Sequence, residues 1–279
     1  MFILKSSPAL LSISNPRCFL GVANFDRQTI INNNVTLLKA AVRKEASMIK
    51  LRRADDRGQT RLSWLDSRHT FSFGDYYDPQ HMGFSQLRVI NEDRVHPGKG
   101  FGTHSHRDME IITYVLEGAL AHKDSTGTSS VIRVGDVQRM SAGTGISHSE
   151  YNASQTEPVH FLQIWIIPGE TGLVPGYQQQ AIPLDKSRGR WTLIASKKGR
   201  DGSVTVHQDV DVWTARFSPE EQATFRLKPS RQAWIQMARG AGTLNGTLLR
   251  AGDGAATSQE EILEVKAVEA AEFLIFDLA

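Results

Sequence analysis

The sequence has only one cysteine, Cys18, among its 279 residues, and this scarcity excludes several kinds of site. A single thiol cannot form a disulfide within the chain. It also cannot build a cysteine-based zinc finger or an iron–sulfur cluster, which need several cysteine ligands. A chain without an internal disulfide is compatible with a reducing compartment. We therefore expect a cytoplasmic protein.

Long apolar segments and an excess of charge of one sign are also scarce. The longest apolar runs, such as Phe161–Ile167 and Phe273–Leu278, are far shorter than the about 18 residues that a membrane-spanning helix needs. The 32 basic and 30 acidic residues nearly balance, and the basic excess lies in residues 1–47, which hold six basic and two acidic side chains. Because binding through phosphates requires a basic surface, we predict neither a membrane nor a direct nucleic-acid partner.

Residues 1–47 differ from the rest of the chain because they show no sustained strand or helix period. A secretory signal would need a continuous apolar core of about 7 to 15 residues, which this segment lacks. Its basic, serine-containing composition leaves an organelle transit peptide open. A third alternative is translated leader, because Lys44-Glu45-Ala46 can be encoded by a string that resembles a ribosome-binding site before Met48. We expect residues 1–47 to be a disordered leader or a mis-assigned start.

From residue 48 onward, short runs rich in β-branched and aromatic residues alternate with turn residues, and runs with a helical period are scarce. This pattern predicts an all-β protein, in which closed or doubled sheets hide the strand edges. The expected strands are Phe84–Val95, Glu110–Leu116, Val131–Val134, Val137–Met140, Val159–Ile167, Trp191–Ser196, Val210–Phe217, Trp234–Ala238, Ile262–Ala267 and Glu272–Leu278.

A weak internal repeat divides this body into two halves. Tyr114–Gly118 resembles Gln236–Gly240, and each is followed by a hairpin and a Gly-Asp turn. A duplicated β-barrel is the simplest architecture that explains the repeat. We predict an N-terminal metal-binding domain at residues 48–175, a polar linker at 176–189, and a C-terminal domain without metal at 190–279.

Histidines cluster in the first half: eight of the nine lie between His69 and His160. His104 and His106 are two residues apart, and a second pair, His148 and Glu150, has the same spacing. Alternate residues of a strand share a face, so two facing strands would supply three nitrogens and one carboxylate. The remaining histidines of this region have no partner at ligand spacing, and we expect them to be structural, exposed or at most behind the ligands: His69, His81, His96, His122 and His160.

The spacing of these residues resembles a known family. Gly98–Glu110 and the glycine-rich segment Gly135–Glu150 match the two motifs of cupins, and Phe71–Tyr77 adds a further match. Together they make residues 48–279 similar to the pirin family of bicupins, some members of which are quercetin 2,3-dioxygenases. The resemblance implies two cupin domains, each a jelly-roll β-barrel.

The resemblance also implies a ligand set. In pirins the metal is held by both histidines of the first motif and by the His-x-Glu of the second, which here are His104, His106, His148 and Glu150. Most cupins take the carboxylate from the first motif, where this chain has Glu110. The pirin pattern gives that role to Glu150 and leaves Glu110 behind the ligands or at a strand end.

The second half should bind no metal. Aligning Gly118 with Gly240 and the later turn Gly135-Asp136 with Gly252-Asp253 places side chains that cannot replace the donors: Arg226 opposite His104, Lys228 opposite His106, Val265 opposite His148, and Ala267 opposite Glu150.

Three imidazoles and one carboxylate include no soft ligand, so the site suits one divalent ion of iron, manganese, cobalt, nickel or copper better than a structural zinc. Availability in the cytosol and the resemblance both favour Fe(II). Four protein ligands leave at least one coordination position open, which a catalytic metal needs.

The resemblance implies two alternative functions. The first is a metal-dependent dioxygenase that opens the ring of a flavonol such as quercetin with O2, with Glu150 as the catalytic base. The second is a non-enzymatic, iron-dependent protein that binds regulators. An enclosed apolar pocket over the metal would favour the enzyme, and a shallow charged surface would favour the binding protein. We expect a monomer.

Overall fold

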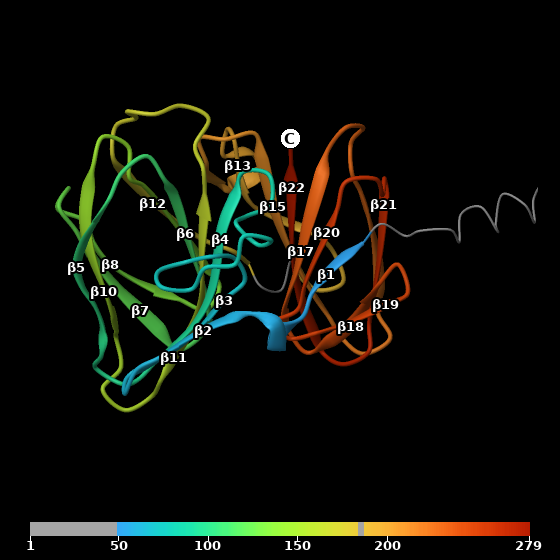
Figure 1. Ribbon diagram of the computed structural model, residues 1–279, viewed down its shortest axis with the longest axis horizontal. Helices are drawn as coiled ribbons and strands as arrows, with labels where there is room; N and C mark the ends of the chain where they lie inside the picture. Colours follow the sequence, from blue (N-terminus) through green and yellow to red (C-terminus); the bar gives the residue numbers. More distant parts are fainter. Residues whose placement is uncertain (1–48, 184–186) are drawn as a thin grey trace, which may run out of the picture. The chain divides into compact units, whose positions relative to one another are not determined.

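The structure is a computed structural model that describes residues 49–183 and 187–279 (Figure 1). Within these ranges the regular structure is made of β-strands, with no α-helix and with short 3-10 turns at Ala54–Asp56 and Arg200–Gly202. The prediction of an all-β protein is confirmed. The same ranges contain no helix long and apolar enough to cross a membrane. The leader expected at residues 1–47 lies outside the described residues.

The first half is built from two antiparallel sheets. The larger sheet has seven strands, in the spatial order β12 (Gly176–Ala181), β9 (Asp136–Ser141), β6 (Glu110–Glu117), β11 (Val159–Ile166), β4 (Leu87–Val95), β3 (Leu65–His69) and β2 (Gly58–Arg61). The smaller sheet has four strands, in the order β5 (Gly100–His106), β10 (Ile146–Asn152), β7 (Ala119–Asp124) and β8 (Ser129–Arg133).

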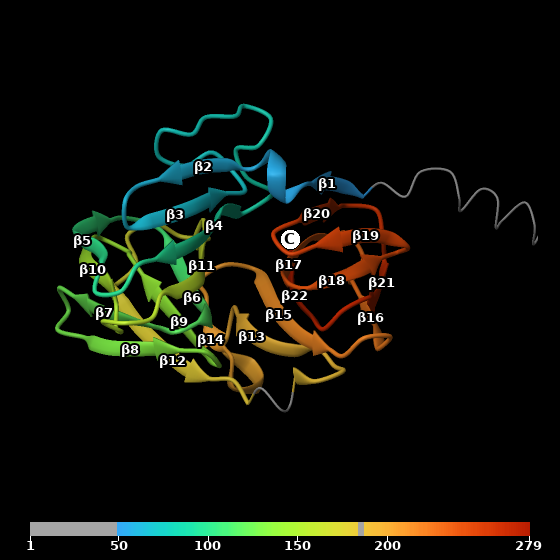
Figure 2. The same cartoon turned by 90° about the horizontal axis from the view of Figure 1, so that it is seen from below.

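The second half repeats this arrangement, except in the pairing of one edge strand. Its seven-stranded sheet has the order β1 (Lys50–Arg52), β20 (Gly254–Thr257), β17 (Gln232–Arg239), β22 (Ala271–Leu278), β15 (Val210–Phe217), β13 (Thr192–Ser196) and β14 (Val204–Thr205). The edge strand β14 pairs with β13 in parallel, whereas β2 pairs with β3 antiparallel. Its four-stranded sheet has the order β16 (Gln222–Arg226), β21 (Ile262–Ala267), β18 (Ala241–Leu244) and β19 (Thr247–Arg250). The two halves lie side by side, with the smaller sheets on the outside (Figures 1 and 2).

The predicted repeat is confirmed at the turn after the central strand of each half. Gly118 follows β6 with φ 74°, and Gly240 follows β17 with φ 69°. A Cβ on Gly118 would lie 2.7 Å from the carbonyl oxygen of Pro158, and a Cβ on Gly240 would collide with the carbonyl of Ala270. The same tight turn therefore requires glycine at both positions. The fold is a bicupin.

The boundaries between the halves differ from the expected ones. Residues 176–181, expected in the linker, form β12 and pair with β9 of the first half. Lys50–Arg52, expected in the first domain, form β1 and pair with β20 of the second half. The prediction was wrong here because both strands are short and polar, so their partners, and not their own periodicity, determine that they are strands. Residues 184–186 of the expected linker lie outside the described residues.

The core between the halves explains why β22 is buried along its whole length. Leu274 and Phe276 pack in a cluster shared with Ile112 and Leu162 of the first half. Alternate residues of β22, such as Phe273, face the interior of the second barrel. A strand covered on both faces is apolar at successive positions, as Phe273–Phe276 is in the sequence.

Candidate metal centre

The predicted ligand residues lie on two neighbouring strands of the four-stranded sheet in the first half. β5 carries His104 and His106, and β10 carries His148 and Glu150. The antiparallel register pairs His148 directly with His104, and it shifts at a bulge between His148 and Glu150. Because residues paired across strands share a face, the three imidazoles lie on the same side of the sheet.

The three imidazoles converge on one point. One ring nitrogen from each of His104, His106 and His148 lies within 4.8 Å of the others. Nε2 of His106 and Nε2 of His148 are 3.0 Å apart. Two nitrogens bound to one ion at about 2.1 Å and about 90° to each other have the same separation, roughly 3.0 Å. The separation of these two nitrogens therefore fits two neighbouring ligands of one metal ion.

Hydrogen bonding and burial prepare these rings as ligands. Nδ1 of His104 lies 2.8 Å from the carbonyl oxygen of Gly102, so this nitrogen carries the proton and Nε2 is free. Burial, with the nearby His104, lowers the pKa of His106 to about 4. Burial, with His104, His106 and His122, lowers the pKa of His148 to about 3. Both rings are therefore neutral at physiological pH, which is the form that binds metal.

Glu150 is a buried carboxyl group next to this cluster. Its Oε2 accepts a hydrogen bond of 2.9 Å from Nε2 of Gln163 on β11. Burial raises the pKa of Glu150 to about 7, and the nearby carboxyl group of Asp93 adds to this effect, although the bond from Gln163 opposes it. Ligand atoms of Glu150, His148 and His122 lie within 4.8 Å of one another, and His148 belongs also to the set formed with the two histidines of β5. A carboxyl group with this pKa can hold or release a proton near neutral pH.

Glu110 lies at the side of the first half that faces the second half. Its Oε2 accepts hydrogen bonds of 3.2 Å from the backbone N–H and the ring of His207, and it lies 4.0 Å from Nε of Arg139. These partners do not belong to the imidazole cluster. The contacts of Glu110 connect the two halves.

Sequence reasoning missed the position of His122. This buried residue on β7 lies with Nδ1 3.5 Å from Nδ1 of His148, and its Nε2 lies 3.0 Å from Oδ2 of Asp124. The statement that His122 lacks a partner at ligand spacing was wrong, because Asp124 is two residues away on the same strand. That spacing was the signal that could have found it. His69, His81 and His160 have hydrogen-bond partners outside the imidazole cluster, as in the pair of His160 with Glu92, and His96 is exposed.

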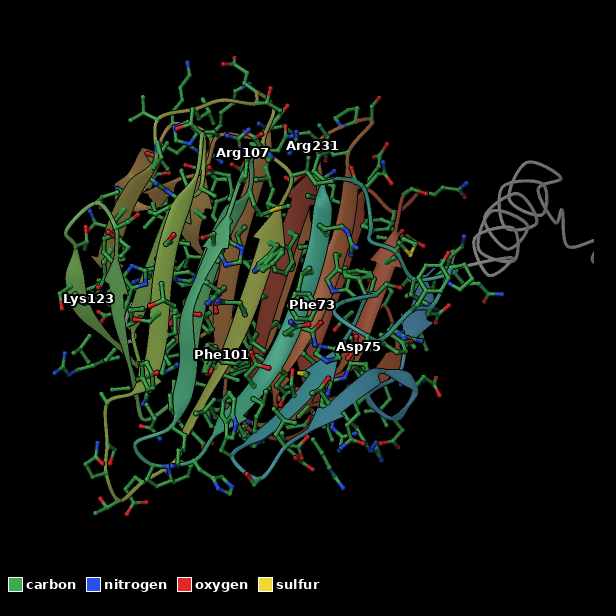
Figure 3. All side chains as sticks on the ribbon, turned by 60° about the vertical axis from the view of Figure 1, so that its left-hand side comes forward. Phe73, Asp75, Phe101, Arg107, Lys123 and Arg231 are labelled. Carbon is green, nitrogen blue, oxygen red and sulfur yellow. The ribbon has the colours of Figure 1, made fainter. Side chains whose placement is uncertain are left out.

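A cavity of about 260 Å³ opens beside the cluster. Phe73, Phe101 and Trp165 form its aromatic part (Phe73 and Phe101 are labelled in Figure 3). Trp165 also packs edge-on against the ring of His106, with centroids 4.9 Å apart. The remaining lining residues are Thr60, Leu65, Ser67, His69, Gly74, Asp75, Asn91, Asp93, His104, His106, Glu150 and Gln163.

Two buried polar atoms of cavity residues have no hydrogen-bond partner among the described residues: Oδ1 of Asp93 and Nε1 of Trp165. Burial raises the pKa of Asp93 to about 7, and the neighbouring Glu92 adds to the rise. An unpaired buried polar group costs about 1 to 3 kcal/mol. Both atoms are therefore suited to contact a polar group of a molecule in the cavity.

Two family models match the two halves of this chain. The model described as Pirin matches residues 50–166, and the model described as Quercetinase C-terminal cupin domain matches residues 193–278. The quercetin 2,3-dioxygenase of Escherichia coli strain K12 is 48% identical over 231 residues, which cover 83% of this chain and 99% of that relative. A putative quercetin 2,3-dioxygenase of Pasteurella multocida is 42% identical over 235 residues, which cover 83% of this chain and 100% of that relative.

Solved structures agree with these relatives. The crystal structure of YhhW from Escherichia coli has a TM-score of 0.80 at 47% identity and covers 83% of this chain and 97% of that chain. The crystal structure of bacterial pirin YhhW in complex with nickel(II), also from Escherichia coli, has a TM-score of 0.78 at 46% identity and covers 82% of this chain and 98% of that chain. Since family models match both halves and these relatives match over nearly their whole length, the chain belongs to the pirin family.

Proposed function

We propose that this chain is a metal-dependent dioxygenase that opens the ring of flavonols such as quercetin with O2. The observation that carries the proposal is one cavity lined by His104, His106, the buried Glu150 and an aromatic wall. A concave site with aromatic walls and a few polar groups suits a small aromatic substrate better than a protein partner. The names of the relatives, quercetin 2,3-dioxygenase, support the same reaction.

His104, His106, His148 and Glu150 would hold one divalent metal ion, for which we propose Fe(II). Imidazole and carboxylate donors suit iron, manganese, cobalt, nickel and copper. The pirin structure in complex with nickel(II) supports a divalent ion in this family. Gln163 donates its hydrogen bond to Oε2 of Glu150, so Oε1 would be the oxygen that binds the metal. When bound, the metal supplies Lewis acidity to the flavonol oxygen and a path for electrons from the substrate to O2.

The protein side chains bind the substrate and take its proton. Phe73, Phe101 and Trp165 offer faces and edges against which the flavonol rings can pack. Oδ1 of Asp93 can accept a hydrogen bond from a substrate hydroxyl, and Nε1 of Trp165 can donate one to a substrate oxygen. Glu150 accepts the proton of the hydroxyl next to the scissile bond, because it is a buried carboxyl group that lines the cavity beside the imidazoles.

The test is anaerobic reconstitution with Fe(II), followed by addition of quercetin and O2. We expect O2 uptake and loss of the flavonol absorption in equal amounts, with release of carbon monoxide. Metal-free protein, free Fe(II) and a His104→Ala variant are the controls. Uptake no greater than that of free Fe(II) would overturn the proposal.

The same assay tests the metal. We expect the Fe(II) protein to turn over faster than protein loaded with manganese, cobalt, nickel or copper. A faster reaction with another of these ions would show that the assignment of iron is wrong while leaving the reaction intact.

A further inference from the structure

The buried residue His122 lies next to His148, one of the predicted metal ligands. β7 pairs with β10 on the side away from β5, and the register sets Asp124 opposite His148 and His122 opposite Glu150. Nδ1 of His148 lies 3.5 Å from Nδ1 of His122, and Nε2 of His122 lies 3.0 Å from Oδ2 of Asp124. The side chains of His122 and Asp124 are fully buried. The three groups form a continuous chain of hydrogen bonds away from the metal centre.

The carboxylate of Asp124 fixes the direction of the hydrogen bond from His122. Oδ1 of Asp124 accepts hydrogen bonds from the backbone N–H and hydroxyl of Thr126 and from the backbone N–H of Thr128. With these donors on Oδ1, Oδ2 is the acceptor for Nε2–H of His122. A neutral imidazole with a proton on Nε2 has an acceptor at Nδ1. The neutral form of His122 can therefore accept a hydrogen bond from Nδ1–H of His148.

This tautomer is the one that metal binding requires. Nε2 of His148 is the nitrogen that lies 3.0 Å from Nε2 of His106, on the side where the imidazoles converge. With the proton on Nδ1, Nε2 presents its lone pair to that point. His104 reaches the same state by donating Nδ1–H to the carbonyl of Gly102. His148 differs because its partner chain ends in a carboxylate, and a carboxylate partner also makes a ligating imidazole more basic.

We propose that His122 is a positioning residue, which, backed by Asp124, fixes the tautomer and ring orientation of His148 for metal binding. The inference rests on the metal site proposed above. The ring of His122 is itself held, because it packs against Tyr177 with centroids 4.9 Å apart and an angle of 35° between the rings. Ligand atoms of His122, His148 and Glu150 also lie within 4.8 Å of one another. The test must therefore distinguish a positioning role of His122 from direct binding of His122 to the metal.

The experiment measures Co(II) binding to the metal-free full-length chain, by competition with a chelator and by the visible spectrum of the bound ion. His122→Phe keeps a ring but removes the acceptor, and we expect Co(II) affinity to decrease about 10- to 100-fold. His122→Asn places an oxygen near the position of Nδ1, so it can still accept the proton of His148. We expect this variant to recover Co(II) affinity to within about threefold of the wild type, with an unchanged visible spectrum.

A matched control removes another buried histidine–carboxylate pair of the same half. Nε2 of His160 lies 2.9 Å from Oε1 of Glu92, and neither residue touches the imidazole cluster. His160→Phe should lower the thermal midpoint but leave Co(II) affinity unchanged. Asp124→Asn should lower Co(II) affinity by less than His122→Phe. The double variant of His122→Phe with Asp124→Asn should lower it no further than His122→Phe alone, because the two residues act in series.

Three results would overturn the inference. If His122→Asn loses as much affinity as His122→Phe and its Co(II) spectrum changes, His122 is a direct ligand. If both variants bind Co(II) like the wild type, His122 is structural only. If the wild-type protein binds no Co(II), both this inference and the proposed metal site are wrong, whereas wild-type binding with unaffected variants leaves the proposed function standing.

Discussion

The two halves of the molecule share one topology but use the interior of their barrels differently. Aligning Gly118 with Gly240 makes Leu244 the equivalent of His122, and strand pairing then extends the comparison along each sheet. Glu150 pairs with His122 as Val265 pairs with Leu244, and His148 pairs with His104 as Leu263 pairs with Phe225. The four equivalents in the second half, Phe225, Leu244, Leu263 and Val265, belong to one hydrophobic cluster. One scaffold can therefore hold either a polar site or a hydrophobic core.

This comparison corrects the alignment of the two halves made from the sequence. That alignment set Arg226 opposite His104, but the register assigns Phe225 to the position, and Arg226 is exposed on the other face of β16. It also set Val265 opposite His148, whereas Val265 is equivalent to Glu150. Because side chains alternate along a strand, an error of one residue exchanges the inner and outer faces. Turns of different length in the two halves caused the error.

The largest effect is expected when residues are exchanged between the halves. His148→Leu installs the residue of the second half, and we expect metal binding and turnover to be lost while the metal-free protein keeps its fold. The reciprocal Leu263→His puts an imidazole into a hydrophobic cluster, and we expect it to cost roughly 1 to 3 kcal/mol in the free energy of unfolding without changing metal binding. Metal analysis and thermal unfolding check both. Metal retained by His148→Leu would contradict the assignment of His148 as a ligand.

The next effect separates the two glutamates of the first half. Glu150→Gln keeps a weak oxygen donor but removes the base, so turnover should decrease about 10²- to 10⁴-fold while part of the metal is kept. Glu110→Gln should lose less metal, because Glu110 contacts His207 and Arg139. Metal content per chain and turnover with quercetin are the measurements. The reverse order of metal loss would show that the carboxylate ligand comes from the first motif.

The pH dependence of metal binding should report Glu150. Its pKa of about 7 means that the metal-free protein holds a proton on Glu150 below pH 7, which the metal must displace. Protonation of Glu150 should therefore decrease the metal affinity about tenfold per pH unit below pH 7, and its effect should disappear above pH 7. His106 and His148, with pKa values of about 4 and 3, release no proton between pH 6 and 8. Calorimetry of metal binding at pH 6 should show that Glu150→Gln releases about one proton fewer per bound ion than the wild type releases.

The smallest effect concerns the cavity. The register makes Ala215 the equivalent of Asp93, because Asp93 pairs with Phe161 as Ala215 pairs with Phe273. Asp93→Ala should weaken quercetin binding about 2- to 13-fold, which corresponds to about 0.5 to 1.5 kcal/mol for one hydrogen bond. Anaerobic fluorescence titration of the metal-loaded protein gives the affinity. Asp66→Ala, on the neighbouring strand and ion-paired to Arg68, is the control. Equal quercetin affinities of the wild type and Asp93→Ala would show that Asp93 does not contribute to substrate binding.

The sequence predicted apolar strands well and polar strands poorly. The expected strands Val210–Phe217 and Ile262–Ala267 have the same bounds as β15 and β21. The bounds of β5, β7 and β10, which carry the site, were not predicted, because polar residues interrupt their alternation; β5 and β10 were expected only as the strands that hold the two ligand pairs. The ligand pairs could still be found, since their spacing of two residues and the family resemblance do not depend on apolar periodicity. The cavity could not be predicted, because residues distant in sequence, from Thr60 to Trp165, line it.

β1 precedes the first half in the chain but pairs with the second half, and this affects how the chain folds during synthesis. Lys50–Arg52 pair with residues 254–256, and Asp253 binds both the side chain of Arg53 and the backbone N–H of Ala54. The ribosome synthesises this edge strand of the second sheet about 200 residues before its partner strand β20. When the first barrel leaves the ribosome, β1 is an unpaired edge strand that could associate with other nascent chains. Its exposed basic residue, Lys50, is the type of charge that discourages such pairing until β20 arrives.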